Sequence, residues 1–265
     1  MAQRDQDFNG AMECLKRHQS SFELSQLCEL EKEEIMNVAR ACEKAGRYKD
    51  MLFVVLAFLS KCAPSYKVEA EERTLLSIAY NKLILPLRVS IRTLTDSLAQ
   101  EESDQVKQQL EVLRDGLILE LEGLCTEVIE LVQRMVLYES AFQDAEAIIW
   151  AYKTTGDHHR YQAELFLPGK DDQKDLAEAA FVRGLNEAQT RLTPISPLRL
   201  SLALNYAVFC YEIMRDEEKG RTIAQEAYDA AELELTSLKM NQTAMPDTET
   251  LMRLIQKTLQ SWKKS

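Results

Sequence analysis

Residues 197–213 read PLRLSLALNYAVFCYEI, and this stretch decides the fold class. Apolar side chains point in nearly every direction from a helix with this sequence, so we expect it to be buried on almost all sides. Its one polar stripe carries Asn205, Val208 and Glu212, spaced by three and four residues. A buried amide or carboxylate needs a partner or a wet groove. Two interpretations stay open: internal pairing of the polar groups, or a groove in which Asn205 holds a peptide backbone beside Leu204 and Val208.

The helical pattern extends over the rest of the chain. With 8 Gly and 6 Pro among 265 residues, helix breakers are few, and apolar residues recur at intervals of three and four. No stretch alternates apolar and polar residues between turn signals, so the sequence predicts an all-α protein. Residues 1–29 predict a partly ordered extension or one extra helix, followed by a helical domain at 30–263. The expected helices are 29–46, 50–61, 68–98, 103–137, 140–166, 172–192, 197–214, 217–238 and 247–263, with breaks at 63–65 and 167–169.

Composition and charge exclude several classes of function. The net charge of −11, from 43 acidic and 32 basic residues, disfavours binding to nucleic acid or to an anionic membrane. The six cysteines follow no metal-binding spacing and are expected to be free thiols in a reducing compartment. The chain has no apolar leader and no apolar run of about 18 residues, so we expect a soluble protein of the cytoplasm or nucleus. Nucleotide-loop, zinc-protease and serine-hydrolase spacings are absent too, so we expect no enzyme, no metal and no other cofactor.

Two of the expected helices carry cationic groups. One face of the helix at 68–98 carries Asn81, Leu85, Arg88 and Arg92. Its two arginines form either a solvated surface pair or a guanidinium clamp for a phosphate or carboxylate. In the segment GDHHRYQAE at 156–164, Glu164 lies one turn after Arg160 and can hold its guanidinium in place. Tyr161 adds a hydroxyl and Lys153 lies on the same face, although an exposed helix salt bridge of little energy is the alternative.

The last expected helix has one apolar face with a polar interruption. That face carries Leu251, Leu254, Thr258 and Trp262. It is either part of the core or the second apolar wall of a groove.

Five segments, taken in chain order, resemble the 14-3-3 family over about residues 30–263. They are 45–51 (AGRYKDM), 71–80 (EERTLLSIAY), 156–164, 197–213 and 250–262 (TLMRLIQKTLQSW). The resemblance implies an antiparallel bundle of about nine helices that pairs into a cup-shaped homodimer. It also implies an amphipathic groove in each protomer that binds a phosphoserine or phosphothreonine peptide.

The resemblance further implies roles for individual residues. The phosphate ligands matched are Arg88, Arg160 and Tyr161, and Arg92 matches a supporting position of the groove. The groove positions matched are Lys153, Leu204, Asn205, Val208, Glu212, Leu254, Thr258 and Trp262. The dimer-surface positions are Arg47, Tyr48, Asp50 and Glu120.

This chain departs from the family pattern at several of those positions. Asn81 stands where the family has a fourth phosphate ligand, a lysine, and Lys82 is expected to point off the stripe because one residue turns a helix by about 100°. Pro86 predicts a kink that either turns Lys82 toward the pocket or splays the helix. Thr258 and Ser261 replace an asparagine and a wall leucine, so we expect a more polar groove.

Two further departures concern the histidines and the dimer. His158 and His159 replace aromatic residues, and they either add pH sensitivity beside a phosphate or are partly exposed without a role. Asp50 is kept, but its expected lysine partner is Gly116. The resemblance therefore implies a homodimer that is weakened or reoriented, or whose surface is covered by residues 1–29.

These observations lead to two hypotheses of function. The first is a non-catalytic adaptor that binds phosphorylated proteins or peptides and regulates or bridges them. The second is a phospho-independent helical scaffold that kept the fold but has a degraded phosphate pocket, as Asn81, Pro86 and Thr258 indicate. Peptide binding with and without the phosphate separates them.

Overall fold

The computed structural model describes residues 10–18, 20, 22–62, 66–137, 143–165, 172–238 and 246–263. These residues form eleven α-helices and two short π-helical turns, and no strand occurs among them. The all-α prediction is therefore confirmed. The chain divides into two compact units, Met1–Gln143 and Asp144–Ser265, which are described separately. The predicted breaks at 63–65 and 167–169 lie outside the described residues.

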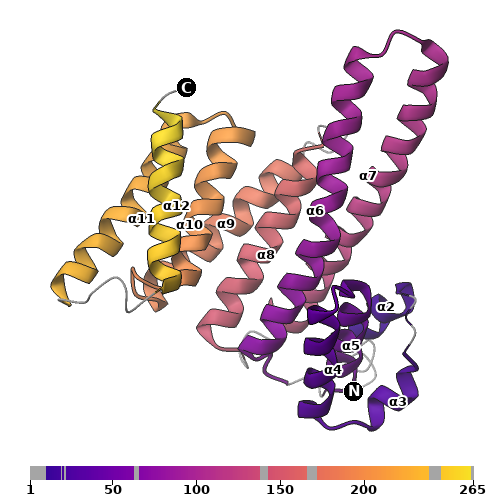
Figure 1. The fold of residues 1–265 in the computed structure, drawn as a ribbon. Coiled ribbons are helices and arrows are strands. Elements are labelled where there is room, and N and C mark those ends of the chain that lie inside the picture. Colours follow the sequence, from indigo (N-terminus) through magenta and orange to yellow (C-terminus); the bar gives the residue numbers. More distant parts are fainter. Residues whose placement is uncertain are drawn as a thin grey trace. The chain divides into compact units, whose positions relative to one another are not determined.

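The first unit consists of short N-terminal helices, a helix pair and a long hairpin. Its elements are α2 (Gly10–Arg17), α3 (Leu24–Glu29), α4 (Lys32–Lys44), α5 (Tyr48–Lys61), α6 (Ala70–Gln100), α7 (Asp104–Val132) and the π-helical turn η1 (Gln133–Leu137). Figure 1 shows α6 and α7 side by side, with α2 to α5 gathered near one end of the hairpin. The described part of the extension thus forms two helices, where one extra helix or a partly ordered arm was predicted.

Local chemistry sets the boundaries of these helices. Glu31 and Glu34 form a reciprocal capping box, so α4 begins at Lys32 and not at the predicted residue 29. After α4, Gly46 adopts a φ of 68°, a left-handed conformation that glycine takes without strain. Pro86 lies inside α6 but does not end it, since the helix continues to Gln100.

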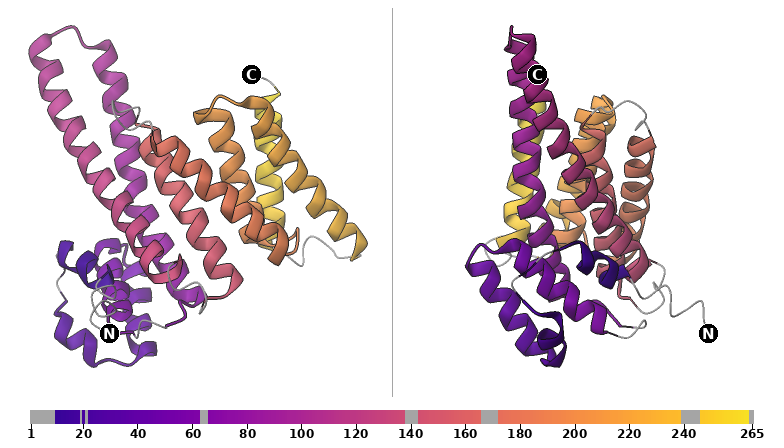
Figure 2. Two further views of the ribbon diagram at one scale, coloured as in Figure 1. Left: turned by 180° about the vertical axis from the view of Figure 1, so that it is seen from behind. Right: turned by 90° about the vertical axis from the view of Figure 1, so that its right-hand side faces the viewer.

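The second unit contains the remaining five helices. They are α8 (Ala145–Ala163), α9 (Asp172–Arg191), α10 (Pro197–Val208) with the π-helical turn η3 (Phe209–Ile213), α11 (Glu217–Ser237) and α12 (Pro246–Trp262). Figure 2 shows α8 and α9 as close neighbours, and α10 packs between α9 and the pair formed by α11 and α12. Among the described residues, no helix has the length and apolarity needed to cross a membrane.

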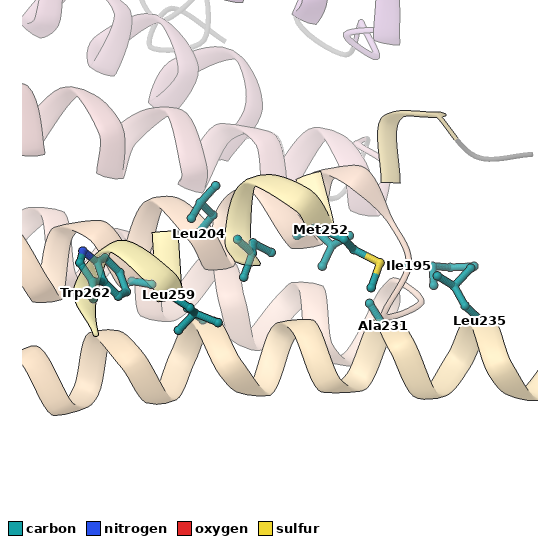
Figure 3. Packing of buried hydrophobic residues seen from close by; sticks show 11 residues of the cluster. Ile195, Leu204, Ala231, Leu235, Met252, Leu259 and Trp262 are labelled. Atoms are coloured by element: carbon teal, nitrogen blue, oxygen red, sulfur yellow. The ribbon is translucent and has the colours of Figure 1, made fainter. Parts of the chain in front are cut away.

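The helix α10 is shared by two apolar cores. Leu202 and Tyr206 face one core, in which they pack with Phe181 of α9. Leu204 faces the other, which includes Trp262. Figure 3 labels seven residues of this second core, which lie on α10, α11, α12 and the turn before α10. They are Ile195 in that turn, Leu204, Ala231, Leu235, Met252, Leu259 and Trp262. Burial on almost all sides of this helix, predicted from its sequence, is therefore confirmed.

Candidate functional site

One stripe of α8 and its C-cap carries four charged side chains at intervals of four, three and four residues: Lys153, Asp157, Arg160 and, at the C-cap, Glu164. The helix begins where the carboxylate of Asp144 accepts from the backbone N–H of Ala147 at 2.7 Å. Beside the stripe, α9 approaches α8 closely at Gly156. A Cβ added to Gly156 would lie only 2.7 Å from two ring carbons of Phe181 on α9. The middle of α8, residues 154–159, is buried as a result.

The carboxylate of Asp157 connects α8 to α10. It is 5% exposed, and its Oδ2 accepts from Nζ of Lys153 at 2.8 Å. Nδ2 of Asn205 donates to Oδ1 and Oδ2 at 2.8 and 2.9 Å, and Nη2 of Arg160 lies 3.6 Å from Oδ1. Burial alone would raise the pKa of Asp157, but Lys153 and Arg160 hold it below its ordinary value. An ionised carboxylate therefore fixes two cations and one amide.

The guanidinium of Arg160 is largely enclosed, with 11% of its side chain exposed. Its Nη1 donates to Oε1 of Glu164 at 2.8 Å, and the ring of Tyr161 lies 4.6 Å from its Cζ. Burial opposes the charge, but Asp157, Tyr161 and Glu164 raise the pKa of Arg160 above its ordinary value. Its Nε is buried with no hydrogen-bond partner among the described residues. The exposed salt bridge considered from the sequence is thus wrong, and the phosphate-binding role of Arg160 stays a prediction.

The two histidines are buried, at 4% and 9% exposure, so the interpretation of His158 and His159 as partly exposed is wrong. Nδ1 of His158 lies 2.7 Å from the carbonyl oxygen of Thr154, and its ring stands edge-on to Tyr161 at 5.4 Å. Nδ1 of His159 lies 2.8 Å from Oε1 of Gln173. Burial lowers the pKa of His158 to about 4 and also lowers that of His159. Both rings are therefore neutral at pH 7 and belong to the packing of α8.

On the polar stripe of α10 and η3, one polar side chain is paired and another is exposed. The amide of Asn205 is half-buried and bonded to Asp157, whereas Glu212 is exposed. Leu204 is buried in the core and Val208 is half-buried against it. Internal pairing therefore holds for Asn205 but not for Glu212, and the groove interpretation of this stripe stays a prediction.

The predicted apolar face of α12 is likewise partly exposed and partly buried. Leu254 is 47% exposed, while Trp262 is 5% exposed and stacks on Tyr211 with ring centroids 4.2 Å apart. The hydroxyl of Thr258 donates to the carbonyl oxygen of Leu254 at 2.9 Å, and that of Ser261 donates to the carbonyl oxygen of Thr258 at 2.7 Å. Trp262 thus belongs to the core, and the two hydroxyls are engaged by their own helix.

Two residues of this region were given no role from the sequence. Asp157 could have been found, because it falls on the helical stripe between Lys153 and Arg160. Arg221 of α11 pairs with Glu217 one turn earlier on its own helix, but its contacts with other elements gave no signal in the sequence. Its Nη2 donates to the carbonyl oxygen of Trp262 at 3.0 Å, and its Cζ lies 5.3 Å from the centroid of the Tyr211 ring. This cation and ring stack hold the end of α12.

The cationic stripe of α6 lies in the first unit. Asn81, Lys82 and Arg92 are exposed there, and Arg88 is half-buried. Nζ of Lys82 lies 5.8 Å from the centroid of the Tyr48 ring. The phosphate-binding roles of Arg88 and Arg92 stay predictions.

The residues matched to a dimer surface are also in the first unit. Nε and Nη2 of Arg47 each lie 2.7 Å from Oδ2 of Asp50, which is 5% exposed. Tyr48 is half-buried and Glu120 is exposed. Asp50 is thus paired within its own chain, and the role of these residues in a dimer stays a prediction.

Comparison with known proteins gives a consistent match. The sequence model of the family described as "14-3-3 protein" matches residues 38–263. The 14-3-3 protein beta/alpha of Mus musculus is 30% identical over 236 residues, which cover 88% of this chain and 93% of that protein. The 14-3-3-like protein A of Vicia faba is 32% identical over 237 residues, which cover 87% of this chain and 88% of that protein. The family match begins inside α4, so α2 and α3 lie outside it.

Proposed function

Because this chain belongs to the 14-3-3 family, we propose that it is a non-catalytic adaptor that binds phosphoserine or phosphothreonine segments of partner proteins in an amphipathic groove. One observation carries the proposal: the guanidinium of Arg160 is largely enclosed and is held in place by Asp157 and Glu164, with the ring of Tyr161 beside it. A phosphorylated side chain brings a charge of about −1.5 to −2 and three acceptor oxygens. Such a group can use the remaining donors of Arg160.

The phosphate is held by charge-assisted hydrogen bonds. Arg160 supplies the guanidinium, and Tyr161 supplies its hydroxyl from the next position of α8. Arg88 is proposed as a further ligand on the strength of the family resemblance, with Arg92 in support. Asn81 is neutral where the family has a lysine, so one charge-assisted contact is absent, which weakens binding by about tenfold or more.

The peptide backbone is held beside the phosphate. Lys153 and Asn205 are both bound to Asp157, so their positions are set before a peptide arrives. Fixing side chains in advance reduces the ordering cost of binding. We propose that these two residues hold the peptide backbone and that Glu164 keeps Arg160 oriented.

The walls of the groove come from α10 and α12. Val208 and Leu254 offer apolar surface, and Leu204 and Trp262 support it from the core. The hydroxyl of Thr258 is engaged by its own helix, so it replaces the family's asparagine without supplying an amide. Glu212 is exposed beside this wall and disfavours acidic residues in the bound segment.

The adaptor works as a homodimer in the cytoplasm, as is general for the family. The ion pair proposed for the dimer joins Arg47 to Glu120, and Asp50 lacks its lysine because the matching position is Gly116. A dimer holds two peptides and gains avidity for a partner with two phosphorylated segments.

Fluorescence anisotropy of a labelled peptide tests the proposal. A phosphoserine peptide should bind at least tenfold more tightly than its unphosphorylated form, and Arg160→Ala should remove the difference. Arg160→Lys keeps the charge but loses the fork geometry, so it should retain only part of the preference. Arg191→Ala is the matched control, because Arg191 also pairs with a glutamate one turn away but is exposed.

The second candidate function is a phospho-independent scaffold. It is favoured by Asn81, which is exposed and neutral where the family places a phosphate ligand. Equal affinity for the two peptides, or normal phosphopeptide binding by Arg160→Ala, would decide for the scaffold and against the adaptor.

A further inference from the structure

The helix α5 is enclosed on every side. Its ten residues from Asp50 to Leu59 are all buried, although a helix at the surface of a bundle normally keeps one polar face. Two of its neighbours are α6, which lies within the family match, and α4, inside which that match begins. The others, α2 and α3, belong to the N-terminal extension and pack on the remaining face. The extension therefore covers apolar surface of α5 that would otherwise face solvent.

A hydrogen bond fastens the extension to α5. Oγ of Ser20 donates to Oδ1 of Asp50 at 2.6 Å. The other oxygen of this carboxylate is taken by Arg47. Both oxygens of Asp50 are thus occupied from within the chain, while 66% of the Arg47 side chain stays exposed.

A second fastening joins the extension to α7. Nε2 of His18 lies 2.7 Å from Oε1 of Glu127, a carboxylate that is 2% exposed. The hydroxyl of Tyr80 donates to the same oxygen at 2.8 Å. Beside this contact, Cys14 and Leu15 of α2 are buried. A buried carboxylate that lost His18 would keep only part of its hydrogen bonding, so the contact stabilises the docked state.

A surface of the same unit remains open. On the middle of α7, Val112, Leu113 and Leu119 are 67%, 54% and 68% exposed. Glu120 is exposed next to them, and Gly116 on this part of the helix has nothing within 4 Å of an added Cβ. Exposed apolar side chains gathered in this way mark a site of interaction. Its carboxylate complements the exposed guanidinium of Arg47, which the same chain presents at the start of α5.

We propose that residues 10–29 are an intramolecular cap that competes with a second copy of this chain for the start of α5. In the capped state Ser20 occupies Asp50, and α2 and α3 cover α5. In the uncapped state the start of α5, with Arg47 and Asp50, packs on the open surface of α7 in the second copy. This inference rests on the homodimer of the proposed function, and it adds that residues 10–29 regulate the formation of that homodimer.

Two variants of the full chain open the cap at different points. Ser20→Asp places a carboxylate against Asp50, and His18→Ala removes the contact with Glu127. Ser25→Asp is the matched control, because it adds the same charge on α3 at an exposed position. Loss of either fastening should favour the open cap by about tenfold, and the dissociation constant of self-association should fall by a similar factor.

Sedimentation velocity over a range of protein concentrations measures self-association. Hydrogen exchange of residues 10–29 measures the opening of the cap. We expect faster exchange and tighter self-association in Ser20→Asp and His18→Ala, with wild-type behaviour in Ser25→Asp. Leu119→Asp, added to Ser20→Asp, should abolish self-association while exchange in residues 10–29 stays fast.

Three results would overturn the inference. One is faster exchange without tighter self-association, because the cap would then conceal no surface for a second copy. Another is a wild-type dimer whose residues 10–29 are as protected as in the monomer. The third is equal self-association in Ser20→Asp and Ser25→Asp. Phosphopeptide anisotropy on the same samples reports the adaptor function separately, because Arg160 is unchanged in all of them.

Discussion

Replacing His158 with phenylalanine should make the second unit less sensitive to acid. Burial lowers the pKa of His158 from its ordinary 6.5 to about 4. As the pH falls below about 6.5, the unfolded chain therefore takes up a proton that the folded chain excludes. The stability associated with neutral His158 is complete above that pH and is lost progressively down to about pH 4.

The magnitude follows from the two pKa values. Their difference corresponds to about 3 kcal/mol at pH values below both, and to about 2 kcal/mol between pH 7 and pH 5. Asp157, whose pKa lies below its ordinary value, stays ionised over that interval and adds no slope. Phenylalanine has no proton to take up, so the variant should lack this loss.

Urea unfolding followed by tryptophan fluorescence measures the effect. Trp150 and Trp262 are the two tryptophans of the chain and both lie in the second unit, so the signal reports on the unit that holds His158. From pH 7 to pH 5, the wild type should lose about 2 kcal/mol more unfolding free energy than His158→Phe. The contribution of His159 is present in both proteins and cancels. Equal losses in the two proteins would refute the reasoning.

Three further predictions concern packing and the polar contacts of the second unit. Gly156→Ala should lower the unfolding free energy by about 1 kcal/mol or more, because its Cβ meets the buried ring of Phe181, and a more stable variant would contradict this. Asp157→Asn should cost about 3 kcal/mol in the same assay, since two cations lose a buried partner, and a loss below about 1 kcal/mol would count against it. Arg221→Ala should speed hydrogen exchange at the end of α12 near Trp262 while exchange in α8 is unchanged. An equal increase of the exchange rate in both helices would contradict the idea that Arg221 supports the end of α12 locally.

The positions of the helices could be predicted closely because helix formation depends on near neighbours in sequence. The helices predicted at 172–192 and 217–238 are Asp172–Arg191 and Glu217–Ser237 in the structure. The predicted and observed helices differ most in their first and last residues. A side-chain cap, which the apolar spacing does not reveal, decides where a helix begins. The sequence also gave no sign that the predicted helix at 103–137 would end as a π-helical turn after Val132.

The candidate site was predictable where its contacts are local. The pairing of Arg160 with Glu164 follows from their spacing on one helix. The bond between Asn205 and Asp157 joins residues 48 positions apart, so it depends on how α8 packs against α10. The burial of His158 was missed for the same reason, since a polar residue type predicts exposure unless its neighbours in space are known.

The contact between Asn205 and Asp157 also fixes which atom of the Asn205 amide points away from the carboxylate. Nδ2 of the amide faces the carboxylate, so the carbonyl oxygen Oδ1 faces away from it. At its outward end this side chain is therefore a hydrogen-bond acceptor. A peptide held against Asn205 must present an N–H group there, and a proline or an N-methylated residue has none. For the groove that we propose, the ionised carboxylate of Asp157 is therefore expected to select the orientation of the peptide bond held against Asn205.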